Sequence, residues 1–453
     1  MNKAILYSGL FLAIIIALIY SMFSASVILA IIMIFGGILF ETSITQKQYR
    51  KSCNRILITT FSVYLITAVI SSISFQDINH AILVDPFQYF QLLSMKSMDM
   101  DPMLNLAACY GLLSDGNELH ELCVRYYILF ANNYLDGASI LYLTLSNVFF
   151  GVLAAGAVYR ILIKIIPEKK AFKYTLIFVL LSPFHFYSVV FVRDIIVACF
   201  FVHAFEIILG KFKITHLLLL VLMIFIVWGI RLYSGIFIIC FIFYYILTQF
   251  TESRATRIIV GSIVVISIIV ALPVIESSDI YSSSTEQLER LQEFDNENSS
   301  PSGLTRTLKS LPAGIREVSL TMFSQIMPFP FYLQMSRANT ISTWFMGLLS
   351  GSFGIFWYMI WFGFLFMFFV YGGYSKFHFN DYILLVIAVV YLLLNLSQPD
   401  VRRLMAVYPI LFYLYCKLRF LYLNYKGIKF LQMNQVLGFA YICLTCFYLF
   451  IKS

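Results

Sequence analysis

The sequence predicts an all-α membrane protein with about 12–13 transmembrane helices. The chain has 453 residues, of which 61% are hydrophobic and only 12% are charged, whereas about a quarter of the residues in a soluble protein are charged. Its apolar residues come in repeated runs of roughly 17–25, the length that a helix needs to cross about 30 Å of hydrocarbon. Backbone groups in lipid must be hydrogen-bonded internally, so we expect each run to be a helix.

The apolar runs define the predicted spans in order. They are residues 4–21, 24–41, 56–74, 138–163, 174–190, 194–209, 215–230, 232–250, 258–275, 343–371, 381–396, 403–423 and 431–450. The first run follows a single Lys3 and has no convincing small-residue cleavage site. We therefore expect it to be retained as a helix rather than removed as a signal peptide. Residues 1–453 then form a single transmembrane domain.

The positive charges predict the orientation of these spans. The clusters "KQYRKSCNR", "KIIPEKKAFK", "GKFK", "ESRATR" and "KLRFLYLNYK" all fall on one side of the threading. Loops rich in Lys and Arg are typically cytoplasmic, which also places the N-terminus in the cytoplasm. The net charge of +8 is therefore explained by topology, and we expect no nucleic acid partner.

Two long segments fall on the outer side. Residues 75–137 form the first, and residues 276–342 form a larger one that begins with a polar, linker-like stretch. Within 304–326, apolar residues recur every three or four positions, and Pro312 is expected to divide the stretch into two short helices. The apolar stripe consists of Leu304, Leu308, Leu311, Ile315, Val318, Met322 and Ile326. This pattern is typical of amphipathic helices that lie in the membrane interface.

Four arginines are exceptions to the tendency of Lys and Arg to lie on the cytoplasmic side. They are predicted at helix ends on the outer side: Arg193, Arg231, Arg402 and Arg403. Ionisable residues at such positions are costly in a bilayer and are candidates for function. A planar, permanently charged guanidinium suits phosphate oxygens, and the N-terminus of a helix beginning at Arg193 favours anions. These arginines predict a lipid-linked phosphate or diphosphate as ligand. Alternatively, Arg193 pairs with Asp194 and Arg402 with Asp400, or the side chains reach water without a further role.

Three residues are candidates for acid–base chemistry. Asp85 lies in "DPFQYF" just outside the third span, His185 shares the outer turn of Arg193, and Glu317 lies on the interfacial segment. Two of them also have a purely structural explanation: Asp85 could cap a helix ahead of Pro86, and His185 could fill an aromatic pocket. Glu317 is a weaker candidate than Asp85.

The chain carries no phosphate-binding loop, no zinc-protease or serine-hydrolase motif and no cofactor-binding glycine loop. The pair Asp99 and Asp101 could bind a divalent ion, but Pro102 follows directly. We therefore expect neither a cofactor nor a metal ion. Cys443 and Cys446 lie inside an apolar run and are expected to be structural, and a Cys109–Cys123 disulfide is left open.

The layout and three segments resemble the bacterial surface-polysaccharide polymerases, the O-antigen or Wzy-like family. The segments are "SPFHFYSVVFVRDIIVACFF", "IRLYSGIF" and "PDVRRLMAVYPILFYL". They are similar to the Ser-Pro, Arg/Lys-Asp, Ile-Arg-Pro-Tyr-like and late Arg-rich segments of that family, although Leu232 stands where proline is common. "PFPFYL" at 328–333 also looks like a segment of one polymerase-like group.

The resemblance implies a glycosyltransferase of the bacterial inner membrane that assembles lipopolysaccharide O-antigen, capsule or exopolysaccharide. It would join oligosaccharide repeat units carried on undecaprenyl diphosphate, at the outer face of the membrane. The four arginines would stabilise the diphosphate leaving group without a metal, and a base would accept the proton of the attacking hydroxyl. The expected partners are these lipid-linked glycans, the bilayer and a regulator of chain length.

Two other functions compete with polymerisation. One is a membrane-embedded glycosyltransferase that uses an undecaprenyl-phosphate sugar, with Asp85 as its base. The other is a polysaccharide transporter or flippase, which should carry charges deep in the middle of its helices. In this chain the four candidate arginines are instead predicted near the outer face of the membrane. The sequence indicates neither the sugars nor the linkage stereochemistry nor the oligomeric state.

Overall fold

The computed structural model describes most of the predicted spans. The described residues are 3–73, 118–211, 213–250, 311–312, 315–325, 329, 332, 335, 338–394, 404–422 and 427–452. The chain divides into two compact units, the first made of Met1–Asp99, Arg125–Glu206 and Phe323–Ser453, the second of Met100–Val124 and Ile207–Met322. All regular elements in the described ranges are helical, which confirms the predicted all-α class.

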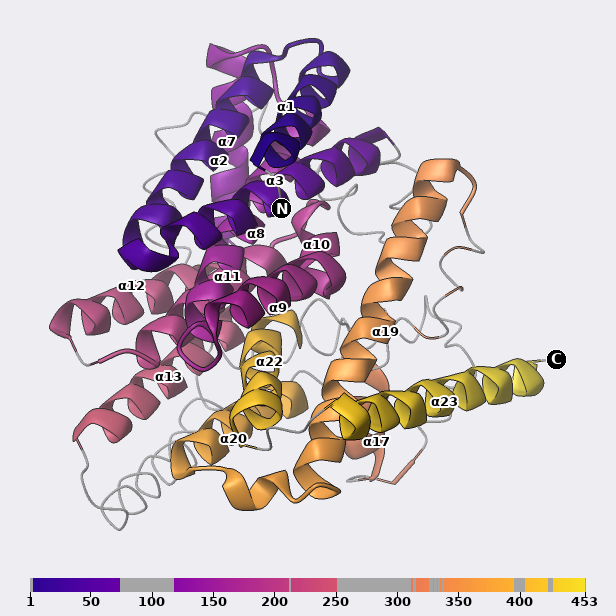
Figure 1. The fold of residues 1–453 in the computed structure, drawn as a ribbon. Helices are drawn as coiled ribbons and strands as arrows, with labels where there is room; N and C mark the ends of the chain where they lie inside the picture. Colours follow the sequence, from indigo (N-terminus) through magenta and orange to yellow (C-terminus); the bar gives the residue numbers. More distant parts are fainter. Residues whose placement is uncertain are drawn as a thin grey trace. The chain divides into compact units, whose positions relative to one another are not determined.

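Most of the described helices (Figure 1) lie within predicted spans, whereas α7 (Glu118–Tyr134) and α17 (Ile315–Ser324) lie in the segments predicted to be outer loops. In chain order they are α1 Lys3–Tyr20, α2 Ala25–Ile44, α3 Arg50–Ile73, α7 Glu118–Tyr134, α8 Ile140–Leu162, α9 Glu168–Leu181, α10 Pro183–Ser188, α11 Asp194–Ile208, α12 Ile214–Ile230, α13 Leu232–Phe250, α17 Ile315–Ser324, α19 Ile341–Phe369, α20 Phe379–Leu394, α22 Tyr408–Lys417 and α23 Gly427–Lys452. Short 3₁₀ turns at Lys47–Tyr49, Gly373–Lys376 and Met405–Val407 precede α3, α20 and α22, and a π-helical turn at Leu418–Tyr422 extends α22.

Several of these helices have the length and composition of membrane spans. Five described segments qualify: Ala25–Ile44, Lys47–Ile73, Ile140–Leu162, Ile341–Phe369 and Phe430–Phe450. Large apolar side chains are exposed along α1, α12 and α23, including Phe225 and Phe439. Water-soluble proteins rarely expose such continuous apolar surface, whereas lipid accommodates it. The described helices are therefore those of a helical membrane protein.

Helix α8 is the central helix of the first unit, packed against α2, α3, α9 and α10. Glycines permit two of these contacts. A Cβ at Gly37 of α2 would lie 2.7 Å from Phe149 Cε2, and a Cβ at Gly151 of α8 would overlap Ser188 Oγ. Small residues allow helices in lipid to approach closely. On the neighbouring side, the hydroxyl of Tyr64 donates to the carbonyl of Val179 at 2.6 Å and so joins α3 to α9.

We expect Gly151→Ala to lower the thermal unfolding midpoint of the detergent-solubilised protein. The new methyl group would overlap Ser188 and also lie 2.9 Å from Tyr64 Cε2, and such overpacking typically costs about 1–3 kcal/mol. Gly36→Ala is the matched control, because nothing lies within 4 Å of that position. There, the better helix propensity of alanine should keep or raise the midpoint. Equal midpoints for the two variants would contradict the close contact.

The predicted fifth span, residues 174–190, is not one helix. It is divided into α9 and α10 at Ser182, which has an extended backbone (φ −100°, ψ 169°) and whose hydroxyl accepts from the N–H of Phe184 at 3.3 Å. Pro183 follows at the first position of α10. Proline has no N–H and restricts the preceding residue, so it begins a helix well but interrupts one. The Ser-Pro pair was the sequence signal for this division.

The beginning of α2 is held by a residue far along the chain. Asp136, in the turn between α7 and α8, accepts from the backbone N–H groups of Ala25 and Ser26 at 2.9 and 3.0 Å and from the Ser26 hydroxyl at 2.8 Å. Desolvation acts to raise the pKa of Asp136, but the hydrogen bonds from Ser24 and Ser26 outweigh it and hold the pKa well below its usual range. The carboxylate therefore stays ionised in mild acid and keeps capping the helix.

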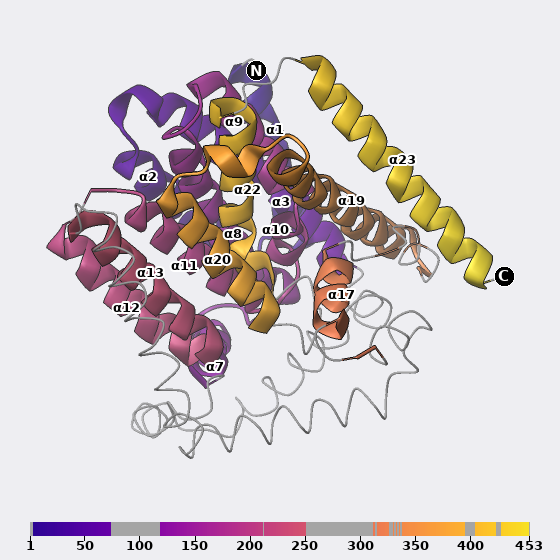
Figure 2. The same ribbon diagram turned by 90° about the horizontal axis from the view of Figure 1, so that it is seen from below.

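The last third of the chain forms the rest of the first unit. Helix α19 packs against α22 and α23 (Figure 2). Trp357 of α19 stacks on Tyr408 with ring centroids 3.6 Å apart and donates from its indole N–H to Gln325 at 2.8 Å. Tyr358 donates to the carbonyl of Leu437 on α23 at 3.0 Å. Aromatic side chains thus form this part of the core, and the polar atoms of Trp357 and Tyr358 are hydrogen-bonded within it.

Candidate functional site

The segment between α10 and α11 is a break in the apolar run, and it ends at Arg193. Residues 189–192 are buried but not helical, and Arg193 is half-buried immediately before α11. The Arg193 carbonyl accepts from the N–H groups of Ile196 and Val197 at 3.1 and 3.4 Å, so this residue begins the helix. At 1.5 Å per residue, α11 carries Arg193 about 20 Å away from Glu206 near its other end.

Asn147 of α8 holds this break in place. Its side-chain amide donates to the carbonyls of Val190 and Val192 at 2.6 and 2.7 Å. Non-helical backbone is tolerated at membrane depth only where other groups of the protein form hydrogen bonds with it. Asn147 provides two of these hydrogen bonds from a neighbouring helix. Asn147 is buried, so the surrounding side chains hold its amide group in position. It fixes the backbone that carries Arg193.

We expect Asn147→Leu to destabilise the first unit and to displace Arg193. The substitution keeps an uncharged side chain of similar size but leaves two buried carbonyls without this donor, at a cost of roughly 1–3 kcal/mol each. The thermal midpoint should fall, and cysteine-labelling rates at an introduced Phe191→Cys should rise as the segment loosens. Asn132→Ala is the control, because Asn132 accepts from the Ala138 N–H in an exposed turn. A labelling rate unchanged by Asn147→Leu would contradict this role.

Arg231 lies at a second break, in the second unit. It is the one residue between α12 and α13, and its backbone is extended (φ −158°, ψ 105°). Its N–H donates to Val227 at 2.7 Å, and its carbonyl accepts from Ser234 and Gly235 at 3.1 and 3.3 Å. A Cβ at Gly235 would lie 3.0 Å from the Trp228 backbone, so glycine permits the tight return. Helices α12 and α13 then pack side by side (Figure 2).

The remaining predicted site residues are spread over different parts of the chain. Asp85, Arg402 and Arg403 lie outside the described residues, and Glu317 lies on α17 but its side chain is not described. Arg193 and Arg231 belong to different units. Their convergence on one ligand therefore stays a prediction. Cys109 of the proposed disulfide is also outside the described residues, while Cys443 and Cys446 are free thiols.

His185 occupies a buried aromatic pocket. Its Nδ1 lies 3.0 Å from the Leu180 carbonyl, its Nε2 lies 3.1 Å from the Thr67 hydroxyl, and its ring stacks on Tyr64 at 4.7 Å. A carbonyl only accepts, so Nδ1 carries the hydrogen and Nε2 faces the hydroxyl. Catalysis by His185 stays a prediction, and it would require one of these contacts to be replaced by substrate.

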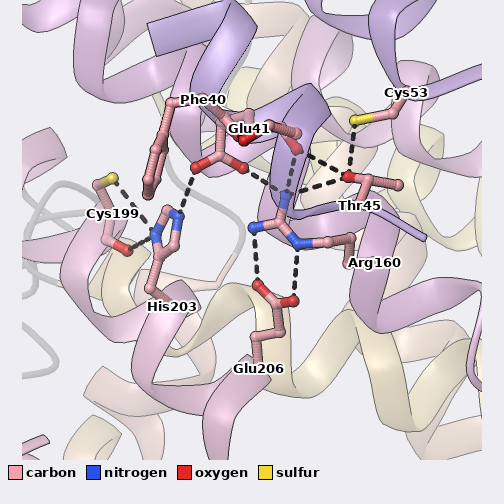
Figure 3. Close-up of polar contacts among 9 residues, drawn as sticks. Phe40, Glu41, Thr45, Cys53, Arg160, Cys199, His203 and Glu206 are labelled. Atoms are coloured by element: carbon pink, nitrogen blue, oxygen red, sulfur yellow. Dashed lines mark hydrogen bonds and ion pairs between the residues drawn. The ribbon is translucent and has the colours of Figure 1, made fainter. Parts of the chain in front are cut away.

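The described part of the chain contains no group of three or more His, Cys, Asp or Glu side chains that could hold a metal ion. It does contain a charged cluster that the sequence patterns did not single out: Glu41 of α2, Arg160 of α8, and His203 and Glu206 of α11 (Figure 3). The sequence carried a signal, because Arg160, His203 and Glu206 interrupt apolar runs and Glu41 ends one.

Fold and site together define an all-helical membrane protein with an arginine at each of two breaks in its apolar helices. Comparisons with known proteins add no family: no family model, no curated protein and no solved structure matches the chain.

Proposed function

We propose that this protein is a polysaccharide polymerase that joins oligosaccharide repeat units carried on undecaprenyl diphosphate. The observation that best supports this is the half-buried Arg193 at the start of α11, on backbone held by Asn147. A cation at membrane depth is costly and is retained where it has a function. An anionic lipid headgroup is the ligand that this position favours, because a guanidinium and a helix N-terminus both attract phosphate oxygens.

The chemistry suits a site made of arginines. As the glycosidic bond to the carrier breaks, negative charge grows on the leaving diphosphate, and fixed guanidiniums stabilise that charge without moving. In this proposal Arg193, Arg231 and at least one of Arg402 and Arg403 bind the diphosphate. A base accepts the proton of the attacking hydroxyl, with Asp85, His185 and Glu317 as candidates. Neither a metal nor a cofactor is part of the proposal.

The proposed function also requires a particular orientation of the protein in the membrane. The arginine-bearing helix ends would face the outer side of a bacterial inner membrane, and the N-terminus would lie in the cytoplasm, as the Lys and Arg distribution predicts. The α17 region would lie along the outer interface and guide the acceptor glycan. A protein that sets chain length would be a further partner.

Deleting the gene and analysing the surface glycan tests this function. We expect the deletion strain to carry single repeat units of normal sugar composition, and the intact gene to restore long chains. Repeats that each lack one sugar would instead identify a single-sugar transferase, for which Asp85→Asn should abolish activity. An unchanged ladder of chain lengths would overturn both functions.

A further inference from the structure

The charged cluster joins three helices of the first unit through Arg160. Its Nε and Nη2 donate to the two carboxylate oxygens of Glu206 at 2.7 and 2.8 Å. Its Nη1 donates to the Glu41 carboxylate, and lies 3.3 Å from the Glu41 carbonyl and 3.5 Å from the Thr45 hydroxyl. Figure 3 shows the guanidinium between the two acids. One cation therefore serves two carboxylates.

The packing around Glu41 indicates a site formed by the fold. Glu41 has no exposed side-chain surface, and the Arg160 side chain is 6% exposed. A Cβ at Gly156 of α8 would overlap Glu41 Oε2, so the glycine provides the space that the carboxylate occupies. A buried carboxylate is stabilised only by charged or hydrogen-bonding partners. Oε2 has Arg160, and Oε1 faces His203 Nε2 at 3.1 Å.

The two ring nitrogens of His203 both face oxygen acceptors. Nδ1 lies 2.9 Å from the carbonyl of Cys199, and Nε2 lies 3.1 Å from Glu41 Oε1. A carbonyl and a carboxylate only accept, whereas a neutral imidazole has a single N–H. Neutral His203 would therefore direct a lone pair at one of these oxygens. The Cys199 thiol is farther from Nδ1, at 3.7 Å.

We propose that the contact between His203 and Glu41 is a buried proton-binding site, in which His203 carries the proton as an imidazolium. Glu41 stays a carboxylate because Arg160 donates to its other oxygen. The charge count agrees: two carboxylates and one guanidinium leave one negative charge, and an imidazolium makes the cluster neutral. Neutrality matters because an uncompensated charge is expensive in this setting. The bound proton thus ties α11 to α2.

The neighbouring groups do not replace that proton. Thr45 donates to the Glu41 carbonyl at 2.8 Å and lies 3.4 Å from the Cys53 thiol on α3. Lys164 is exposed and donates to the backbone carbonyl of Glu206 at 3.0 Å, away from the His203 contact. Glu206 already has both oxygens on Arg160. Among the titratable groups that the structure describes in this cluster, His203 alone contacts Oε1 of Glu41.

Nitrogen NMR of the full-length protein in lipid bilayers, labelled with ¹⁵N-histidine, tests the site directly. The His203 signal is assigned by its loss in His203→Gln. At pH 7, where an ordinary histidine is mostly neutral, we expect both ring nitrogens of His203 to be protonated. His185, whose two nitrogens face a carbonyl and a hydroxyl, should be neutral and serves as the internal control. An unprotonated nitrogen on His203 at this pH would overturn the proposal.

Glu41→Gln provides the second test. A glutamine amide can donate to an unprotonated Nε2 and still accept from Arg160, so the cluster becomes neutral without the extra proton. We expect the His203 signal to change to that of a neutral ring with hydrogen on Nδ1 alone, and His185 to be unaffected. Persistence of the doubly protonated signal would show that Glu41 is not the partner and would overturn the proposal. If the variant does not fold, the wild-type spectrum still decides.

Discussion

Replacing Arg231 by lysine is expected to slow polymer formation about 10- to 150-fold while leaving the protein in the membrane at normal abundance. Lysine keeps the charge and could reach water from the same helix end, but it cannot present two parallel N–H groups to a phosphate. Losing one charge-assisted contact worth roughly 1.5–3 kcal/mol in the transition state gives that reduction in rate. The backbone bonds of Arg231 to Val227, Ser234 and Gly235 do not involve its side chain, so the connection between α12 and α13 should persist.

The measurement is the length distribution of the surface glycan in cells that carry the variant as their only copy. We expect single repeat units to accumulate and long chains to diminish. Arg50→Lys is the matched control: Arg50 begins α3 among the predicted cytoplasmic charges and donates to the Thr45 and Ser43 carbonyls at 3.0 and 2.8 Å. That variant should polymerise at nearly the wild-type rate. A normal ladder of long chains from Arg231→Lys would count heavily against diphosphate binding by this residue.

Much of the fold could be predicted because bilayer thickness limits the length of each apolar run. The predicted span 138–163 corresponds to α8 at Ile140–Leu162, and the predicted span 343–371 corresponds to α19 at Ile341–Phe369. The boundaries differ where capping chemistry acts. Ser139 accepts from Tyr142 at the start of α8, and Thr340 and Thr343 form a reciprocal cap at the start of α19.

The contacts between helices could not be predicted in the same way. Asn147 and Val190 are 43 positions apart, and Glu41 and His203 are 162 apart. Hydropathy indicates that a residue lies in a span, but it carries no information on which helix lies opposite. The isolated Glu41 and Arg160 could have been flagged as costly intramembrane charges. Their pairing depended on the packing that Gly156 permits.

The candidate arginines also show that local sequence predicts helix ends better than contacts between helices. The predictions that a helix begins at Arg193 and that another ends at Arg231 were correct. The predicted spans end at 190 and resume at 194, which correctly left a non-helical turn before Arg193. The sequence did not indicate that this turn is buried or that Asn147 binds its carbonyls. No local sequence pattern indicates that a distant asparagine donates hydrogen bonds to these carbonyls.

Arg160→Met is expected to destabilise the protein more than Gly151→Ala. Methionine preserves the apolar part of the side chain but leaves Glu41 and Glu206 without their shared cation. Removing one partner of a buried ion pair typically costs about 3–5 kcal/mol, because the remaining charge is uncompensated. The thermal unfolding midpoint of the detergent-solubilised protein and its abundance in the membrane should both fall. Lys164→Met is the control, since Lys164 is exposed and contacts a backbone carbonyl of Glu206 rather than its carboxylate.

The compensated variant separates lost charge balance from lost packing. Combining Arg160→Met with Glu41→Gln and Glu206→Gln removes all three of these charges, and His203 can then be neutral, with the new glutamine amide on α2 donating to it. Replacing a buried ionic network by well-packed hydrophobic side chains of similar volume often costs no stability, and the methionine and two glutamines here likewise leave no charge uncompensated. We therefore expect the triple variant to recover most of the midpoint that Arg160→Met loses. A triple variant as unstable as Arg160→Met would mean that the guanidinium stabilises the helices through its hydrogen-bond geometry rather than by neutralising Glu41 and Glu206.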